Sequence, residues 1–100
     1  NFVVIERDNQ QGDKVQLKRL YRFSIDGLTP AAEGGSFPVV SKTVVHDLLP
    51  DLKATGGWVL DKVEGTAITK KGEVYVVTDN DGVDDSSGET RFMHLGKLFR

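Results

Sequence analysis

Acidic and amide side chains cluster at two points that a single hairpin would bring together. Glu64 stands at the start of the run EGTAIT, and Asp79, Asn80 and Asp81 directly follow the run EVYVVT. If these runs are two antiparallel strands joined by KKG, the start of the first lies beside the end of the second. Side-chain oxygens gathered in this way suit Ca²⁺, which takes roughly six to eight oxygen ligands. The sequence therefore predicts a calcium site formed by Glu64, Asp79, Asn80 and Asp81.

A plain turn is the alternative for the same acidic segment. Asn, Asp and Gly are the residues that turns prefer, so DNDG needs no metal to explain it. The EF-hand pattern does not fit, because counting from Asp79 puts Val83 at a ligand position and Thr90 at the last one. The acidic loop is thus either a calcium site of another kind or a structural turn.

Three arginines are candidates for binding an anionic substrate, because a guanidinium donates two parallel hydrogen bonds to a phosphate or carboxylate. Arg7 and Arg19 lie on the first predicted hairpin, and Arg91 follows the acidic loop. Arg19 interrupts an apolar face, and its alternative explanation is an ion pair with Glu6 or Asp8. Lys14 and Lys18 are expected on solvated strand faces.

Other catalytic groups receive little support. The chain has no cysteine, and none of its serines stands in a G-x-S-x-G nucleophile elbow. His46 and Asp47 are neighbours in a predicted strand, so their side chains point to opposite faces and form no dyad. His94 lies between two apolar residues of the last predicted strand. No catalytic residue is assigned.

The elements that must position these residues are mainly strands. Alternating and β-branched runs predict strands at residues 2–7, 14–25, 38–46, 64–69, 73–78 and 90–98, with a short helix at 48–54. In the longest run, Val15, Tyr21 and Phe23 share the expected apolar face, and Leu20 falls on the polar one. EVYVVT is apolar on both faces, which indicates a strand covered on both sides. The fold is predicted to be all-β, with antiparallel sheets.

Composition narrows the function classes. One hundred residues fit a single domain, 1–100, in which residues 1–49 would form a first sheet and 57–100 a second. A net charge of −2 gives no broad basic surface, so nucleic-acid binding is not expected. The chain contains no apolar run long enough to span a membrane.

The motifs ERDN, KRLYRF, DLLPDL, KVEGTAIT, GEVYVVTDND and ETRFMHLGKL, in this order, resemble the end of the bacterial phytase-like family, the esterase-like activity of phytase domain. The resemblance implies a β-propeller several times longer than this chain, in secreted or periplasmic hydrolases of phosphoesters or esters. It implies that this C-terminal portion is inactive alone. Thr78 departs from the pattern, since relatives often carry an amide there.

A propeller blade is a four-stranded antiparallel sheet, so the six strands would be the last three of one blade and the first three of the next. Their open edges would pair with the rest of the propeller or with a second copy of the chain, unless the strands form a small sandwich. The alternative function is a non-catalytic binding or scaffolding module.

Overall fold

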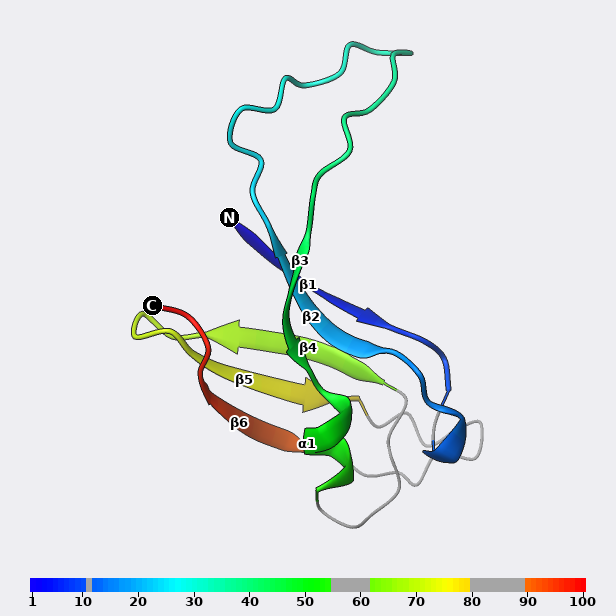
Figure 1. Cartoon of the computed structure of the whole chain (residues 1–100), viewed down its shortest axis with the longest axis vertical. Coiled ribbons are helices and arrows are strands. Elements are labelled where there is room, and N and C mark those ends of the chain that lie inside the picture. The colour runs from blue at the N-terminus through cyan, green and yellow to red at the C-terminus, as the bar shows by residue number, and fades with distance from the viewer. Residues whose placement is uncertain (11, 55–61, 80–89) are drawn as a thin grey trace.

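In the part of the chain that the structure describes, the strands form two three-stranded antiparallel sheets. The computed structural model describes residues 1–10, 12–54, 62–79 and 90–100 (Figure 1). Its elements are β1 (Phe2–Arg7), η1 (Gly12–Lys14), β2 (Lys18–Phe23), β3 (Thr43–Asp47), α1 (Leu49–Lys53), β4 (Val63–Ile68), β5 (Glu73–Thr78) and β6 (Phe92–Lys97). The sheet orders are β1-β2-β3 and β4-β5-β6, so neighbours in sequence pair in space. The all-β prediction is confirmed.

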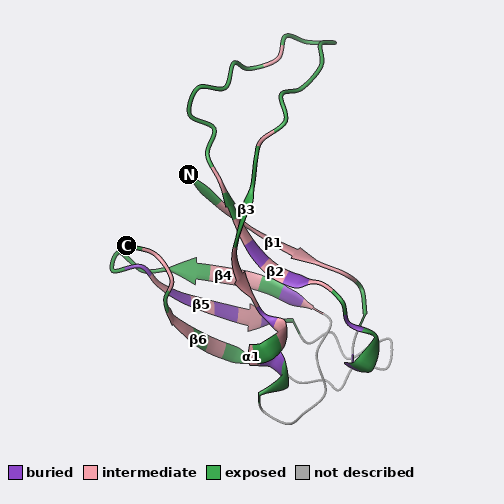
Figure 2. Ribbon diagram, viewed as in Figure 1, coloured by how far each residue is buried: buried purple, intermediate pink, exposed green. Residues whose placement is uncertain are grey.

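The core lies between the two sheets and under α1. Its buried apolar residues come from both halves of the chain, and they are Val15, Leu20, Leu48, Leu52, Val63, Val74 and Val76. Figure 2 shows this burial along β2 and β5, the central strands of the two sheets. The architecture is open and fits either a fragment of propeller blades or a small sandwich.

The helix α1 closes one end of the core. Pro50 stands in its first turn, where a missing backbone N–H costs nothing, as expected from the sequence. The backbone N–H of Leu48 donates to the carbonyl of Lys18 at 2.8 Å, which attaches the start of the helix to β2. Leu48 and Leu52 are fully buried, so the helix is stabilised mainly by the apolar side chains that it places in the core.

The predicted facing of the second strand is wrong. Leu20 and Lys18 are fully buried, whereas Tyr21 and Phe23 lie on the outer, half-buried face. Phe23 stacks on Phe2 of the neighbouring strand at 5.3 Å between ring centroids, so the outer aromatic face is stabilised by cross-strand contacts. Alternation alone assigned the core to the more apolar face, but α1 and the second sheet pack against the opposite one.

The hairpin of β4 and β5 is confirmed. Gly72 has φ +85° in its turn, and an added Cβ would lie 2.0 Å from the carbonyl oxygen of Phe99, so no side chain fits there. At the other end of the hairpin, Val63 pairs with Thr78 and Gly65 with Val77. Glu64 is therefore the extra residue of a β-bulge, a feature that reorients a side chain at a strand end.

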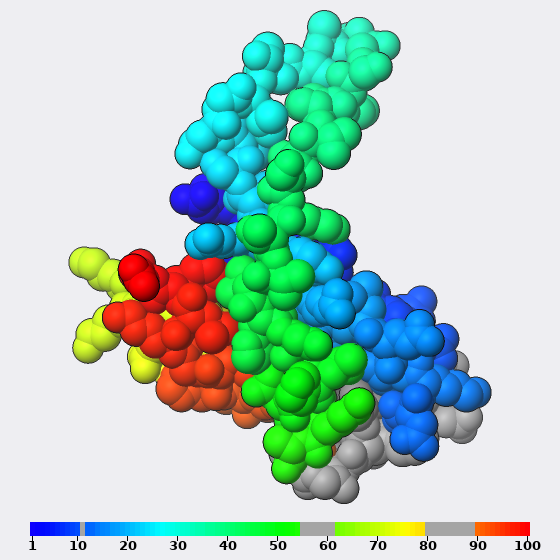
Figure 3. Space-filling view, in the orientation of Figure 1, coloured from blue at the N-terminus to red at the C-terminus, as the bar shows by residue number. Residues whose placement is uncertain are grey.

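Residues 24–42, here called the arm, leave β2, turn and return to β3 while projecting away from both sheets (Figure 1). The strand predicted over 38–46 is shorter, since β3 starts at Thr43. Figure 3 shows the arm as a separate lobe above the rest of the molecule. Among the described residues no helix is long and apolar enough to cross a membrane.

Candidate functional site

Glu64 and Asp79 emerge at the same end of the sheets, here called the closed end, where β1 and β5 finish and β2, β4 and β6 begin. The backbone N–H of Asp79 donates to the carbonyl of Lys62 at 2.7 Å, which extends the hairpin beyond β5. Both carboxylates are exposed. The other two predicted ligands, Asn80 and Asp81, lie outside the described residues. Glu64 and Asp79 thus stand at the same end of the hairpin, and the calcium site itself stays a prediction.

Arg7 contacts Glu64 directly, although the sequence suggested separate roles for them. The Arg7 Nη2 atom lies 2.6 Å from Glu64 Oε1, and its Nη1 donates to Asn9 Oδ1 at 3.0 Å. The pair joins β1 of the first sheet to β4 of the second. An arginine beside a candidate ligand can offer donors to an anion, and it also neutralises part of the carboxylate charge.

Arg91 makes a second link between the two halves of the chain at the closed end. Its guanidinium donates to the carbonyl of Leu52 in α1 at 3.1 Å. Its backbone N–H donates to the hydroxyl of Thr78 at 2.8 Å, and the N–H of Thr78 returns to the Arg91 carbonyl at 2.9 Å. Arg91 therefore holds β5, the approach to β6 and the helix together.

Arg19 lies apart from this group, on the face of β2 opposite Leu20. It stands across the sheet from Glu6 and Asp47. The pKa of Arg19 is raised by a side-chain hydrogen bond with Tyr21 and, less, by the charge of Asp47, so the side chain is a permanent cation. The expected pair with Asp8 is wrong, because Asp8 binds Lys18, and the Glu6 carboxylate contacts Lys42.

The predicted exposure of Lys18 is wrong. Its side chain is fully buried rather than solvated, and its ammonium contacts three oxygens of one loop. The Nζ atom lies 3.0 Å from Asp8 Oδ1 and donates to the carbonyls of Asp8 and Gln10, both at 2.9 Å. A buried ammonium is tolerated only with partners of this kind. The pair closes the β1–β2 loop over the core.

Asp8 organises the same loop from its carboxylate. Its Oδ2 accepts the backbone N–H groups of Gln16 at 2.8 Å and Leu17 at 2.9 Å. Burial raises the pKa of Asp8, but the donors from Gln16, Lys18, Leu17 and Gln10 together outweigh it and hold that pKa well below the usual range. Asp8 is therefore ionised at any ordinary pH. No strand pattern reveals such a role, because the partners come from a loop.

Comparison with known families identifies the family of the chain. The family model Phytase-like, described as esterase-like activity of phytase, matches residues 1–82. The chain belongs to this family. The matched segment contains β1 to β5, the Asp8–Lys18 pair and all four predicted calcium ligands, and it stops before β6. Searches of curated proteins and of solved structures found no match.

The two histidines of this Phytase-like chain each have an acidic neighbour in space. His46 Nε2 lies 2.6 Å from Asp51 Oδ2 on α1, while Asp47 instead accepts the backbone N–H of Leu49. His94 stacks on Tyr75 at 4.6 Å and lies 3.5 Å from Glu73. Within the described part of the chain, His, Asp and Glu side chains form no group of three suited to a metal. The histidines are best explained as contacts between elements.

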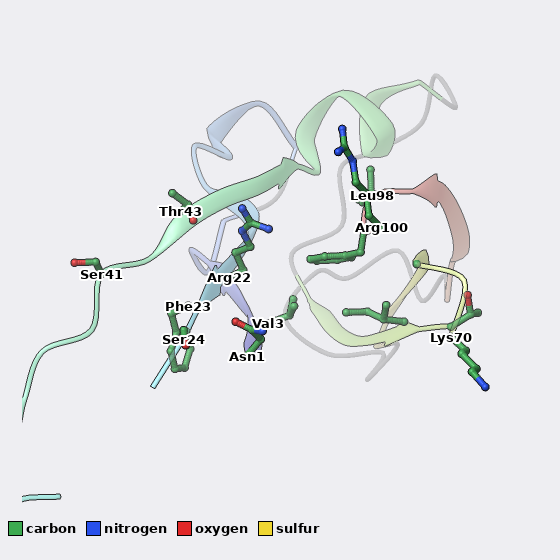
Figure 4. A pocket seen from close by; sticks show the side chains of 14 residues that line it. Asn1, Val3, Arg22, Phe23, Ser24, Ser41, Thr43, Lys70, Leu98 and Arg100 are labelled. Atoms are coloured by element: carbon green, nitrogen blue, oxygen red, sulfur yellow. The ribbon is translucent and has the colours of Figure 1, made fainter. Parts of the chain in front are cut away.

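At the opposite end of the sheets, here called the open end, a cleft of about 1000 Å³ lies between the first sheet and the C-terminal segment. Figure 4 shows Arg22 and Thr43 on one side of it, with Leu98 and Arg100 on the other. Three basic side chains, Arg22, Lys70 and Arg100, are among the described residues that line it, with no acidic one among them. The predicted site and the cleft are thus at opposite ends.

Proposed function

We propose that the protein is part of a β-propeller hydrolase that acts on phosphoesters or esters, with the closed end as its site. The observation that carries the proposal is that the family match covers the β4–β5 hairpin, with Glu64 and Asp79 at one end of it. The two sheets supply the antiparallel blade strands that a propeller requires. The Phytase-like membership supports secretion or a periplasmic location.

Glu64 and Asp79, with Asn80 and Asp81, are the proposed ligands of Ca²⁺. Exposed carboxylates at a strand end are hard oxygen donors of the type that calcium prefers. The contact with Arg7 does not prevent this, because a carboxylate has two oxygens and Glu64 can accept from Arg7 through one of them. A bound cation would polarise a phosphoryl or carbonyl oxygen of the substrate.

The proposed role of Arg7 and Arg91 is to orient an anionic substrate beside these carboxylates. Both guanidinium groups already lie at the closed end and are anchored by contacts to Glu64 and Leu52. Anchored donors lose less side-chain freedom when they bind an anion. Arg19 is also proposed to bind the anionic substrate. It would do so at the edge of the site, because it lies apart from Arg7 and Arg91.

A non-catalytic binding or scaffolding module is the second candidate. The observation in its favour is that Arg7 and Arg91 each connect the two halves of the chain, which explains their positions without any substrate. The acidic loop would then be a structural turn. The open strand edges of both sheets would pair with the rest of a propeller or with a second copy.

Calcium titration separates the two candidates. We expect isothermal titration with CaCl₂ to give measurable heat for the protein and calcium to raise its melting temperature, because a ligand of the folded state stabilises it. Glu64→Gln and Asp79→Asn should abolish both effects. Glu33→Gln and Asp26→Asn, which remove the same charges from the arm, are matched controls and should change neither. Binding that survives in Glu64→Gln and Asp79→Asn would exclude this site.

Hydrolysis tests the enzymatic part. The complete propeller, of which this chain is proposed to be a part, should hydrolyse p-nitrophenyl phosphate or p-nitrophenyl acetate, and Asp79→Asn in it should reduce the rate at least about a hundredfold, as expected for loss of an electrostatic group at the reacting centre. An Asp26→Asn variant should retain the rate. Turnover unaffected by Asp79→Asn would place the chemistry elsewhere, and calcium binding without turnover of either ester would favour the binding module.

A further inference from the structure

The arm presents apolar side chains to solvent. Phe37 is 84% exposed and Val39 is 91% exposed, while Ile25 near the base is 48% exposed. Isolated exposed apolar residues are ordinary, but here they share one projecting segment that contributes nothing to the core. The same segment carries the carboxylates of Asp26 and Glu33. Lys42, at the base of the arm, pairs with Glu6 of β1, so the rest of the arm surface is both apolar and acidic.

The cleft at the open end has the complementary character. Its basic side chains are Arg22, Lys70 and Arg100, and its apolar wall is formed by Val3, Phe23, Ile68, Leu98 and Phe99. A volume of about 1000 Å³ is at the upper limit of the pockets that enclose a drug-sized ligand, so several side chains fit into it. An acidic segment with an aromatic anchor is the occupant that this combination favours.

The arm does not fill the cleft of its own chain. Its two ends, at Ser24 and Ser41, form part of the cleft rim, and from there it projects away (Figures 1 and 4). The high exposure of Phe37 and Val39 confirms that both side chains are clear of the sheets. A second copy, related by a two-fold axis, can bring its own arm to this cleft while receiving the first arm in return.

We propose that the protein forms a dimer by reciprocal exchange of arms. The arm of each copy lies in the basic cleft of the other, with Phe37 and Val39 against the apolar wall and Glu33 near Arg22 and Arg100. This contact lies at the end opposite Glu64 and Asp79 and is independent of the proposed hydrolase function. It differs from pairing through strand edges, because side chains of the arm determine it.

Analytical ultracentrifugation over a range from micromolar to hundreds of micromolar is the first test. The wild-type chain should dimerise, and increasing salt should weaken the dimer because opposite charges meet in the cleft. Phe37→Asp and Arg22→Glu should each weaken dimerisation at least about tenfold, as for an interface anchor. Phe92→Asp is the matched control: Phe92 is 72% exposed at the closed end, and its substitution should leave dimerisation unchanged.

Mixing two defective variants is the decisive test. Phe37→Asp chains have a defective arm and an intact cleft. Arg22→Glu chains have an intact arm and a defective cleft. Because either substitution alone should break an arm–cleft contact, a dimer of one variant keeps no intact contact and a mixed dimer keeps one, so the mixture should associate more tightly than either variant alone. Circular dichroism establishes that both variants are folded.

Three results would overturn the proposal. They are a wild-type chain that stays monomeric over the whole range, a dimer unaffected by Phe37→Asp, as pairing of strand edges would give, and a mixture no tighter than its components.

Discussion

The two ends of the sheets are held in contrasting ways. At the closed end, polar side chains bind specific partners from other elements, as in the Asp8–Lys18, Arg7–Glu64 and Arg91–Leu52 contacts. At the open end, a long arm and a cleft leave apolar and basic groups facing solvent. The difference shows that contacts within one chain stabilise the closed end, while the open end leaves apolar and basic side chains exposed, which we propose a second copy covers.

Substitution of the buried Lys18 should give the largest effect on stability. Lys18→Met keeps most of the aliphatic stem but removes the ammonium, which leaves the carbonyls of Asp8 and Gln10 without their donor. We expect the free energy of unfolding to fall by about 3 kcal/mol. Urea denaturation measures it, with Lys14→Met as the matched control. Lys14 is exposed, so its variant should change stability by less than about 0.5 kcal/mol. Equal effects of the two variants would contradict the special role of the closed end.

Asp8 predicts how stability depends on pH. Because its pKa is lower in the folded state than in the unfolded chain, its contribution is fully present above the ordinary Asp pKa of about 3.9 and is lost as the pH falls toward the folded value. The stability difference between wild type and Asp8→Asn should therefore be constant from neutral pH to about 5 and shrink below about 4. Urea melts at several pH values measure it.

Asp13→Asn is the control for this pH series, since Asp13 is exposed in η1. Its stability difference from wild type should stay small at every pH. If the stability difference between wild type and Asp8→Asn grew on acidification, the pKa of Asp8 would not be lowered on folding, which would contradict the account.

The Arg7–Glu64 contact should contribute less than the Lys18 pair. The two side chains are 23% and 46% exposed, so water screens their attraction. A double-mutant cycle of Arg7→Gln and Glu64→Gln, measured in chelator to exclude calcium, should give a coupling free energy of about 0.5 kcal/mol. A coupling above about 2 kcal/mol would mean that Glu64 is primarily a structural anchor rather than a ligand.

The arm should give the smallest effect on folding. Phe37→Ala removes a larger side chain than Leu52→Ala, yet Phe37 is exposed and Leu52 is fully buried. Under dilute, monomeric conditions we expect less than about 0.5 kcal/mol for Phe37→Ala and about 3 kcal/mol for Leu52→Ala. Comparable losses would show that the arm packs on the sheets in solution.

The strands and the hairpin could be predicted from the sequence, because local alternation and turn residues determine them. EVYVVT became β5 and KKG its turn, and the short helix after His46 formed around Pro50 as expected. Element ends were less accurate: the long run from residue 14 shortened to Lys18–Phe23, since Asp8 draws the preceding segment into a loop.

The sequence did not predict which face of β2 is buried, nor which residues its charged side chains contact. Tertiary packing decides which face of a strand is buried, and the sequence of one strand does not contain the position of α1 or of the second sheet. For the candidate site, the antiparallel pairing of β4 and β5 puts Glu64 and Asp79 at the same end of the hairpin. The contact of Glu64 with Arg7, however, joins residues 57 positions apart in two different sheets.

Amide hydrogen exchange of the wild-type chain at a low and a high protein concentration tests the contrast between the two ends most directly. We predict that closed-end amides bonded within the chain, those of Gln16, Leu17, Leu48 and Arg91, are protected at both concentrations. Amides of the arm should exchange rapidly at low concentration and become protected at high concentration. Arm amides that exchange at the same rate at both concentrations, or closed-end amides that exchange as rapidly as the arm, would contradict it.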